Sequence, residues 1–261
     1  MKPEKWFRCI SSEWRKFYSG SYEELLTNMA QAGLHAAVGY QMRRIIPYEE
    51  RIFPALIFGA MIPDLDIIVV AVASLFYSIP LAEEIFHRTF SHSFFTLTFV
   101  FLLFAILSEL KKKPILKSIG KGIAIGMLTH LLIDTLFWFQ EINLLWPLPL
   151  EPINLWSFWK APLVIFHIFL ALEFFFFRWY AWFLITKHLK APGNQSWFVK
   201  YLNIWKNWGT YLFLLFIIFL IWNPPFFKII FGIAYIPSLI MALFSTFMSR
   251  DALEFRLRPV N

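Results

Sequence analysis

The chain has little cysteine and little charge. Its single thiol, Cys9, excludes an internal disulfide and any CxxC metal or redox motif. Charged residues make up 16% of the 261 residues, well below the roughly one quarter that is typical of soluble domains. The sequence also begins without the continuous apolar core of a secretory signal, so we expect the first apolar spans to direct membrane insertion.

The chain is instead rich in long apolar runs. Hydrophobic residues make up 59% of the chain and aromatic residues 20%, with 32 Phe and 12 Trp, which is more than a soluble core of this size would bury. The composition predicts an all-α fold, a multi-pass transmembrane helical bundle. The apolar runs predict six spans, at about residues 55–79, 93–109, 119–139, 163–186, 209–222 and 226–248.

Two segments precede the first predicted span. Residues 1–28 interleave basic and aromatic side chains, which predicts an interfacial amphipathic segment in the headgroup layer. Residues 29–42, MAQAGLHAAVGYQM, are rich in small residues and too short to span, a composition that suits close packing between helices. We expect both segments on the cytoplasmic side, the second without crossing the membrane.

The positive charge is distributed as in a membrane protein. The net charge is +7, and lysine and arginine gather in short segments between apolar runs, such as KKK at 111–113. If the spans alternate, most of these segments fall on one side, together with the basic C-terminal residues. The bias predicts that this side is cytoplasmic and that the chain crosses the inner or plasma membrane several times. Such a distribution gives no reason to expect a nucleic-acid partner.

Eight ionisable side chains lie within or beside the apolar runs. Each costs roughly a few kcal/mol at membrane depth, so together they predict a functional site. A divalent metal ion would account for the whole set, because imidazoles and carboxylates ligate zinc and manganese and a cation offsets buried aspartate charge. The eight are His35, Asp64, Asp66, His87, Arg88, His92, His130 and Asp134. We therefore expect a polar metal site between helices.

The spacing within three motifs supports this expectation. In HLLID, His130 and Asp134 are four residues apart, so they share one helix face and could reach one ion. In HRTFSHS, a separation of five predicts that His87 lies in a loop and His92 at the start of the next helix, which Ser91 could cap. In PDLD, at 63–66, the proline predicts a helix break or a helix start.

Each motif alone also fits a structural role. His35 could make an interhelical hydrogen bond, and Arg88 could be an interfacial anchor. PDLD could be a loop between two shorter helices, and HxxxD could be a hydrogen-bonded pair. These roles would require separate partners for eight costly groups, so one shared site is the better interpretation.

The motif order resembles that of the bacterial membrane-bound metal-dependent hydrolase family, the YdjM-like proteins. The shared order is a histidine in a small-residue helix, PDLD, HRTFSHS, HLLID and then LLWPL, over about residues 30–150. The family's patterns are LPDxD and HRxxTHS, and this chain has Ile62 before the proline and Ser91 in place of the threonine. The resemblance implies a hydrolase core at 29–150. It is silent on residues 151–261, where the apolar runs predict additional transmembrane helices.

More distantly, the motif order is similar to that of the all-helical zinc-dependent phospholipases C and single-strand nucleases. Those enzymes have a further histidine one turn beyond HxxxD, where this chain has Trp138, so we expect one or two ions rather than three. The similarity implies that His35, Asp64, His87, His130 and Asp134 are metal ligands, and His92 of HRTFSHS is a sixth candidate.

The resemblance implies a hydrolase that uses a divalent metal, Zn²⁺ or alternatively Mn²⁺. Such an ion would lower the pKa of a bound water toward roughly 7. Asp66 is then the candidate for orienting or deprotonating that water, and Arg88 for stabilising charge on a substrate oxygen. The membrane setting predicts membrane lipids as partners and an amphiphilic or phosphoester substrate.

Two alternatives of a different class remain open. A transporter could hold acids and histidines as a proton or cation relay, and His167, Glu173 and Arg178 in the fourth predicted span would then join the path. The simpler interpretation of that span is that Glu173 pairs with Arg178 and fastens helices. The second alternative is a metal-stabilised membrane scaffold without turnover.

Overall fold

The computed structural model describes residues 31–137, 139, 141–159, 162–192, 196–222 and 227–255. Within these ranges the chain forms helices and no β-strand, with one isolated bridge between Ile142 and Ile153. The predicted all-α fold is confirmed. The predicted interfacial segment at 1–28 and Trp138 lie outside the described residues.

The first part of the chain is built from short and interrupted helices, and the second part from long ones. The first part contains α2 (Ala32–Gln41), η2 (Met42–Arg44), α3 (Ile52–Met61), η3 (Pro63–Leu65), α4 (Asp66–Ala73), α5 (Ile79–Phe86), η4 (Phe90–His92), α6 (Phe94–Lys111) and α7 (Pro114–Phe137). The second part contains α8 (Leu163–Lys190), α9 (Ser196–Trp222), α10 (Phe227–Met248) and α11 (Arg250–Glu254).

The helices confirm a multi-pass arrangement. Among the described residues, five helices (α6 to α10) are long and apolar enough to cross a membrane. Helix α3 with η3 and α4, bent by 44°, would be a sixth if the pair is one broken span. The break falls at Pro63, as the PDLD motif predicts, because proline removes a backbone donor from the helix. The fifth predicted span was too short, since α9 begins at Ser196 rather than near residue 209.

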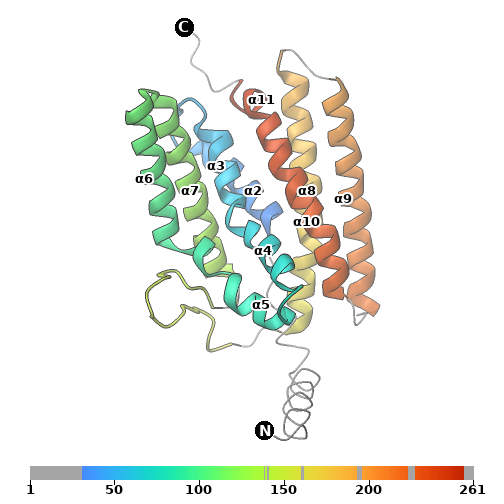
Figure 1. The fold of residues 1–261 in the computed structure, drawn as a ribbon. Coiled ribbons are helices and arrows are strands. Elements are labelled where there is room, and N and C mark those ends of the chain that lie inside the picture. The colour runs from blue at the N-terminus through green and yellow to red at the C-terminus, as the bar shows by residue number, and fades with distance from the viewer. Residues whose placement is uncertain are drawn as a thin grey trace, which may run out of the picture.

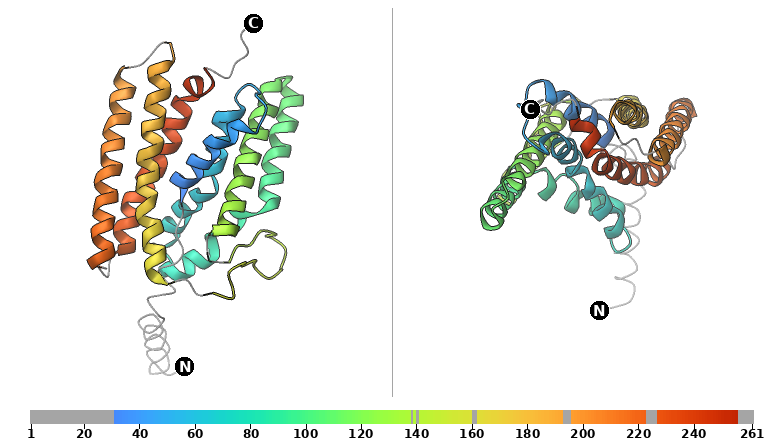
Figure 2. Two further views of the ribbon diagram at one scale, coloured as in Figure 1. Left: turned by 180° about the vertical axis from the view of Figure 1, so that it is seen from behind. Right: turned by 90° about the horizontal axis from the view of Figure 1, so that it is seen from above.

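The helices form two groups with α2 and α3 between them (Figure 1). The helices α6 and α7 pack together on one flank, and α8, α9 and α10 make up the other, which Figure 2 shows from behind and from above. Helix α2 contacts α3, α7 and α8. The described part of the small-residue segment, residues 31–42, therefore lies inside the bundle rather than apart from it, and His35 is buried there.

The connections that carry the basic residues gather at one end of the bundle. The α2–α3, α6–α7 and α8–α9 connections lie there together with α11, while α5 and the segment between α7 and α8 lie at the other end (Figure 1). Arg51, before α3, donates to Asp251 of α11 at 2.7 Å, which ties two of these connections together. This grouping is the one that the charge pattern predicts, and the cytoplasmic assignment of that end stays a prediction.

Glycine sets the close contact between α3 and α7. A Cβ at Gly126 would overlap the carbonyl oxygen of Leu56, and one at Gly59 would overlap that of Ile123. Only glycine permits such an approach of two helix backbones. The second helix group is filled by aromatic rings instead, including Phe174 against Phe216 with ring centroids 4.9 Å apart.

Candidate metal centre

The eight ionisable residues singled out in the sequence meet at one place. They come from α2, from the broken span, from the connection before α6, and from α7, and each is at most 5% exposed. Segments separated by up to about a hundred residues thus deliver imidazoles and carboxylates to one buried cluster. This cluster consists of His35, Asp64, Asp66, His87, Arg88, His92, His130 and Asp134.

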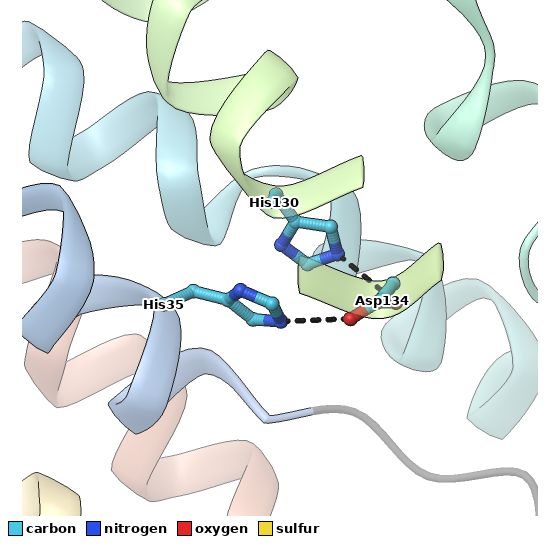
Figure 3. Close-up of side chains that lie close together, drawn as sticks. All are labelled: His35, His130 and Asp134. Carbon is cyan, nitrogen blue, oxygen red and sulfur yellow. Dashed lines mark ion pairs between the residues drawn. The ribbon is translucent and has the colours of Figure 1, made fainter. Parts of the chain in front are cut away.

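Asp134 and His130 lie on one face of α7, as their spacing predicts, and they meet His35 from α2 (Figure 3). His35 Nε2 is 3.1 Å from Asp134 Oδ1, and His130 Nε2 is 3.5 Å from Asp134 Oδ2. The rings of His35 and His130 stack with centroids 3.7 Å apart. Helix α2 therefore contributes directly to the cluster.

The rings of His92 and His130 face each other through their Nε2 atoms. His130 Nδ1 lies 2.8 Å from the carbonyl oxygen of Ala60, so it carries the proton and Nε2 carries a lone pair. His92 Nδ1 lies 2.9 Å from Ser91 Oγ, which donates to Asp66 Oδ2, so His92 Nε2 also carries a lone pair. The two Nε2 atoms are 3.0 Å apart. Two neutral imidazoles so oriented repel unless a proton or a cation lies between them.

Asp66 organises the HRTFSHS segment from the side. Its Oδ1 is 3.0 Å from His87 Nδ1, and its Oδ2 accepts from Arg88 N at 3.0 Å and Ser91 Oγ at 2.9 Å. Arg88 has a φ of 54°, a left-handed conformation that a non-glycine residue holds only where its surroundings impose it. Both oxygens of Asp66 are thus engaged by residues of one segment, which fixes the backbone turn and the His87 and His92 rings.

Asp134 lies close to four other side chains of the cluster. Besides His35 and His130, it lies 3.5 Å from His92 Nε2 and 3.6 Å from Arg88 Nη2, both measured from Oδ2. A guanidinium beside a ligand-type carboxylate balances its charge and presents further donors to a bound anion.

Two overlapping groups have the geometry to hold a metal ion. One is formed by His35, His130 and Asp134, the other by Asp64, His92 and His130, and within each group one ligand atom per residue lies within 4.8 Å of the others. Because His130 Nδ1 bonds Ala60, the single Nε2 atom serves both groups, so they describe one centre. His87 belongs to neither group.

Unpartnered atoms show that the cluster fits a cation. Asp64 Oδ2, His35 Nδ1 and His87 Nε2 are buried without a hydrogen-bond partner among the described residues. Buried polar atoms are normally satisfied, so such orphans need an explanation. A divalent ion coordinated by imidazole and carboxylate donors supplies one for Asp64 and His35, whereas His87 lies outside both groups that could hold the ion.

The cap of α6 differs from the prediction. Ser93, not Ser91, is the N-cap, with its Oγ accepting from Phe95 N at 3.1 Å. Ser91 bonds Asp66 instead, and His92 lies in the 3₁₀ turn before the helix. Two serines precede the same apolar run, and only the tertiary contact with Asp66 decides between them.

Sequence reasoning missed the residues that hold the start of α2. Glu173, fully buried in α8, accepts from Gly33 N at 2.6 Å and from Leu34 N at 3.3 Å. Tyr235 of α10 accepts from Ala32 N at 3.2 Å. A carboxylate at a helix N-terminus satisfies orphan N–H groups and complements the helix dipole. The signal was an acid inside an apolar span, but its partner lies 140 residues away in sequence.

The predicted pairing of Glu173 with Arg178 is wrong in this structure. Glu173 engages α2, whereas Arg178 Nε donates to Thr210 Oγ1 of α9 at 2.9 Å. His167, the third polar residue of that span, stacks on Phe227 with centroids 4.2 Å apart. All three therefore contact other helices.

The fold and the cluster define a multi-pass helical membrane protein with a buried histidine–aspartate centre suited to a metal ion. The chain belongs to the YdjM inner membrane protein family, whose model matches residues 27–247. The match continues through α8, α9 and nearly all of α10, well past the 30–150 region in which the motifs lie. No curated protein and no solved structure matches the chain significantly.

Proposed function

We propose that this inner-membrane family member is a metal-dependent hydrolase that cleaves phosphoesters of amphiphilic substrates. The observation that carries the proposal is the approach of His92 Nε2 and His130 Nε2 to 3.0 Å, with each opposite ring nitrogen already bonded. Fixing the second nitrogen of a histidine in this way is the usual arrangement around a metal ligand.

Five side chains are the proposed ligands. They are His35, Asp64, His92, His130 and Asp134. Imidazole and carboxylate donors without thiolate suit Zn²⁺ or Mn²⁺, and a bound ion of this kind supplies Lewis acidity and a nucleophile from water at neutral pH. Asp64 Oδ2 and His35 Nε2, both buried without a hydrogen-bond partner among the described residues, support the presence of such an ion.

The remaining residues of the cluster take supporting roles in this proposal. Arg88 lies beside Asp134 and offers a forked donor for a phosphate oxygen as negative charge develops there. Asp66 was expected to orient or deprotonate the water. Its oxygens accept bonds from His87, Arg88 and Ser91, which favours a positioning role for it.

The contacts of α8 bear on the transporter alternative. A relay would need polar groups that line a route across the membrane. Glu173 binds the backbone of α2, Arg178 binds Thr210, and His167 stacks on Phe227. These helix-fastening contacts favour the hydrolase.

Elemental analysis of the detergent-purified protein tests the metal. We expect zinc or manganese in stoichiometric amount, and at least a tenfold lower content in His130→Ala. His188→Ala is the matched control, because His188 lies near the end of α8 and bonds Ser249 Oγ at 3.0 Å, outside the cluster. Protein without stoichiometric metal, or equal metal in His130→Ala and wild type, would overturn the centre.

Turnover separates the hydrolase from the scaffold. We expect the metal-loaded protein to hydrolyse bis(4-nitrophenyl) phosphate or phosphatidylglycerol vesicles, and His130→Ala to lose that activity while His188→Ala keeps it. A metal-loaded protein that hydrolyses neither substrate would instead identify a metal-stabilised scaffold.

A further inference from the structure

The segment between α7 and α8 is apolar although it is not a helix. Residues 141–159 contain only two charged residues, Glu141 and Glu151. The segment exposes large apolar side chains, with Phe158 at 80% and Leu150 at 55%. Trp146, Leu148, Leu155 and Trp159 are exposed as well. A connection in water would be rich in polar residues, so this composition calls for an apolar environment.

The inner edge of the segment is fastened to the motifs of the metal centre. Ile142 and Leu144 are buried against Leu131, the neighbour of His130 in α7. Phe94 N donates to the carbonyl oxygen of Leu144 at 2.9 Å, next to the HRTFSHS segment.

Two further bonds secure the rest of the segment. Ser93 Oγ donates to the carbonyl oxygen of Trp146, and Trp156 Nε1 donates to that of Leu136 at 2.9 Å. The segment is therefore fastened to the residues at the start of α6 and to α7, next to two of the elements that supply ligands.

The outer edge continues the lipid-facing surface of α6. Only 6% of the apolar window of α6 is buried inside the protein, and Phe95 at its first turn is 47% exposed. The segment lies directly beyond the ends of α6 and α7, level with the ends of α8 and α9 (Figure 1). Helix α6 has 18 residues and α8 has 28, a difference of about 15 Å in length at 1.5 Å per residue. The segment fills the depth that α6 does not reach.

We propose that residues 141–159 form a lipid-binding surface embedded in the membrane leaflet beside the metal centre, and that the substrate is a phosphoester lipid of that leaflet. Tryptophan with aliphatic side chains is typical of the membrane interface, and continuity with the lipid-facing side of α6 favours lipid over a protein partner. The substrate class rests on the proposed hydrolase function, whereas the embedding does not.

Fluorescence quenching in nanodiscs tests the embedding. In a Cys9→Ser background, Phe158→Cys carries an NBD label, and Glu151→Cys in the same segment is the matched control for a water-facing position. We expect a nitroxide lipid to quench the label at 158 at least threefold more than the label at 151, with the opposite order for aqueous iodide. High iodide access at position 158, without quenching by the nitroxide lipid, would overturn the surface. If quenching depends on protein concentration and not on nitroxide lipid, the surface contacts a second copy of the chain instead of lipid.

Substrate preference tests the second half of the proposal. We expect the double variant Leu155→Ser, Phe158→Ser to lower the ratio of phosphatidylglycerol hydrolysis in vesicles to bis(4-nitrophenyl) phosphate hydrolysis by at least tenfold. An unchanged ratio would overturn the role of this surface in selecting a lipid substrate, and a wild type that hydrolyses only bis(4-nitrophenyl) phosphate would overturn the lipid substrate class. If the wild type hydrolyses neither compound, the hydrolase proposal fails, while the quenching result still decides whether the segment is embedded.

Discussion

The two helix groups solve the packing problem in different ways. Between α3 and α7, glycine lets the backbones touch, and a carbonyl oxygen of α3 can then orient His130. In the α8–α10 group, rings such as Phe174, Phe216 and Phe231 fill the space between long helices. Backbone contact leaves little freedom for a ligand side chain, whereas aromatic packing supplies bulk and adapts to changes in volume. The candidate metal centre lies in the group that tolerates changes in volume less well.

The two groups are joined at α2. Glu173 from α8 and Tyr235 from α10 hold the first turn of the helix that carries His35. These two side chains bind backbone N–H groups of α2 rather than a ligand side chain. Three substitutions test this contrast.

The largest effect is expected from Gly126→Ala. The added methyl group would overlap the backbone of α3, and overpacking of this kind costs about 1–3 kcal/mol or more, against about 1 kcal/mol gained in helix propensity. Separation of α3 from α7 would also move His130 away from Ala60 and Asp64. We expect a lower SDS midpoint of unfolding and loss of bound metal.

Gly232→Ala in α10 is the matched control, because nothing lies within 4 Å of its added methyl group. We expect it to be neutral, or more stable by up to about 1 kcal/mol, with full metal content. Similar behaviour of the two variants would contradict the difference between the groups.

A smaller effect is expected from Asp66→Asn. An amide can accept through only one atom and introduces two donors among groups that already donate, so the His87 and His92 rings would lose their fixed orientation. Substitution of such orienting residues typically lowers metal affinity about 10- to 100-fold. Competition with a chromophoric chelator measures this loss. Asp251→Asn, at the opposite end of the bundle, should leave the affinity unchanged, and an equal loss in both variants would argue against the role of Asp66.

The smallest effect is expected from Glu173→Leu. It leaves the Gly33 and Leu34 N–H groups without their acceptor, which costs about 1–3 kcal/mol, and part of that cost reaches His35. We expect metal affinity to fall about fivefold, with most of it restored by Glu173→Gln. In a His35→Ala background the substitution should add no further loss of affinity, as coupled positions do in a double-mutant cycle. An additive loss would show that Glu173 acts on stability alone.

Local patterns in the sequence predicted much of this structure. The apolar runs gave the long helices, Pro63 gave the break, and the four-residue spacing put His130 and Asp134 on one face. These features depend on helix geometry and on hydrophobicity, which act over a few residues. We predicted that the four ligand-bearing segments meet because burying their charged groups separately would be costly.

The sequence could not predict which of several chemically equivalent residues makes a given long-range contact. Ser91 and Ser93 are equally good caps in isolation, and the bond from Ser91 to Asp66 decides the matter. Glu173 could have paired with a cation in its own helix, yet it binds the start of α2. That long-range contact helps to position α2 in the bundle. The sequence therefore indicated His35 as a ligand but not where its helix lies.

The composition of the centre has a consequence for chemical durability. All five proposed ligands are imidazoles or carboxylates, and the only thiol of the chain is Cys9, distant in sequence from every one of them. Peroxide and disulfide exchange act on thiolates, whereas neither forms adducts readily with these donors. Exposure to an oxidising environment would therefore leave the centre's metal-holding groups intact, without any need for a reductant to maintain them.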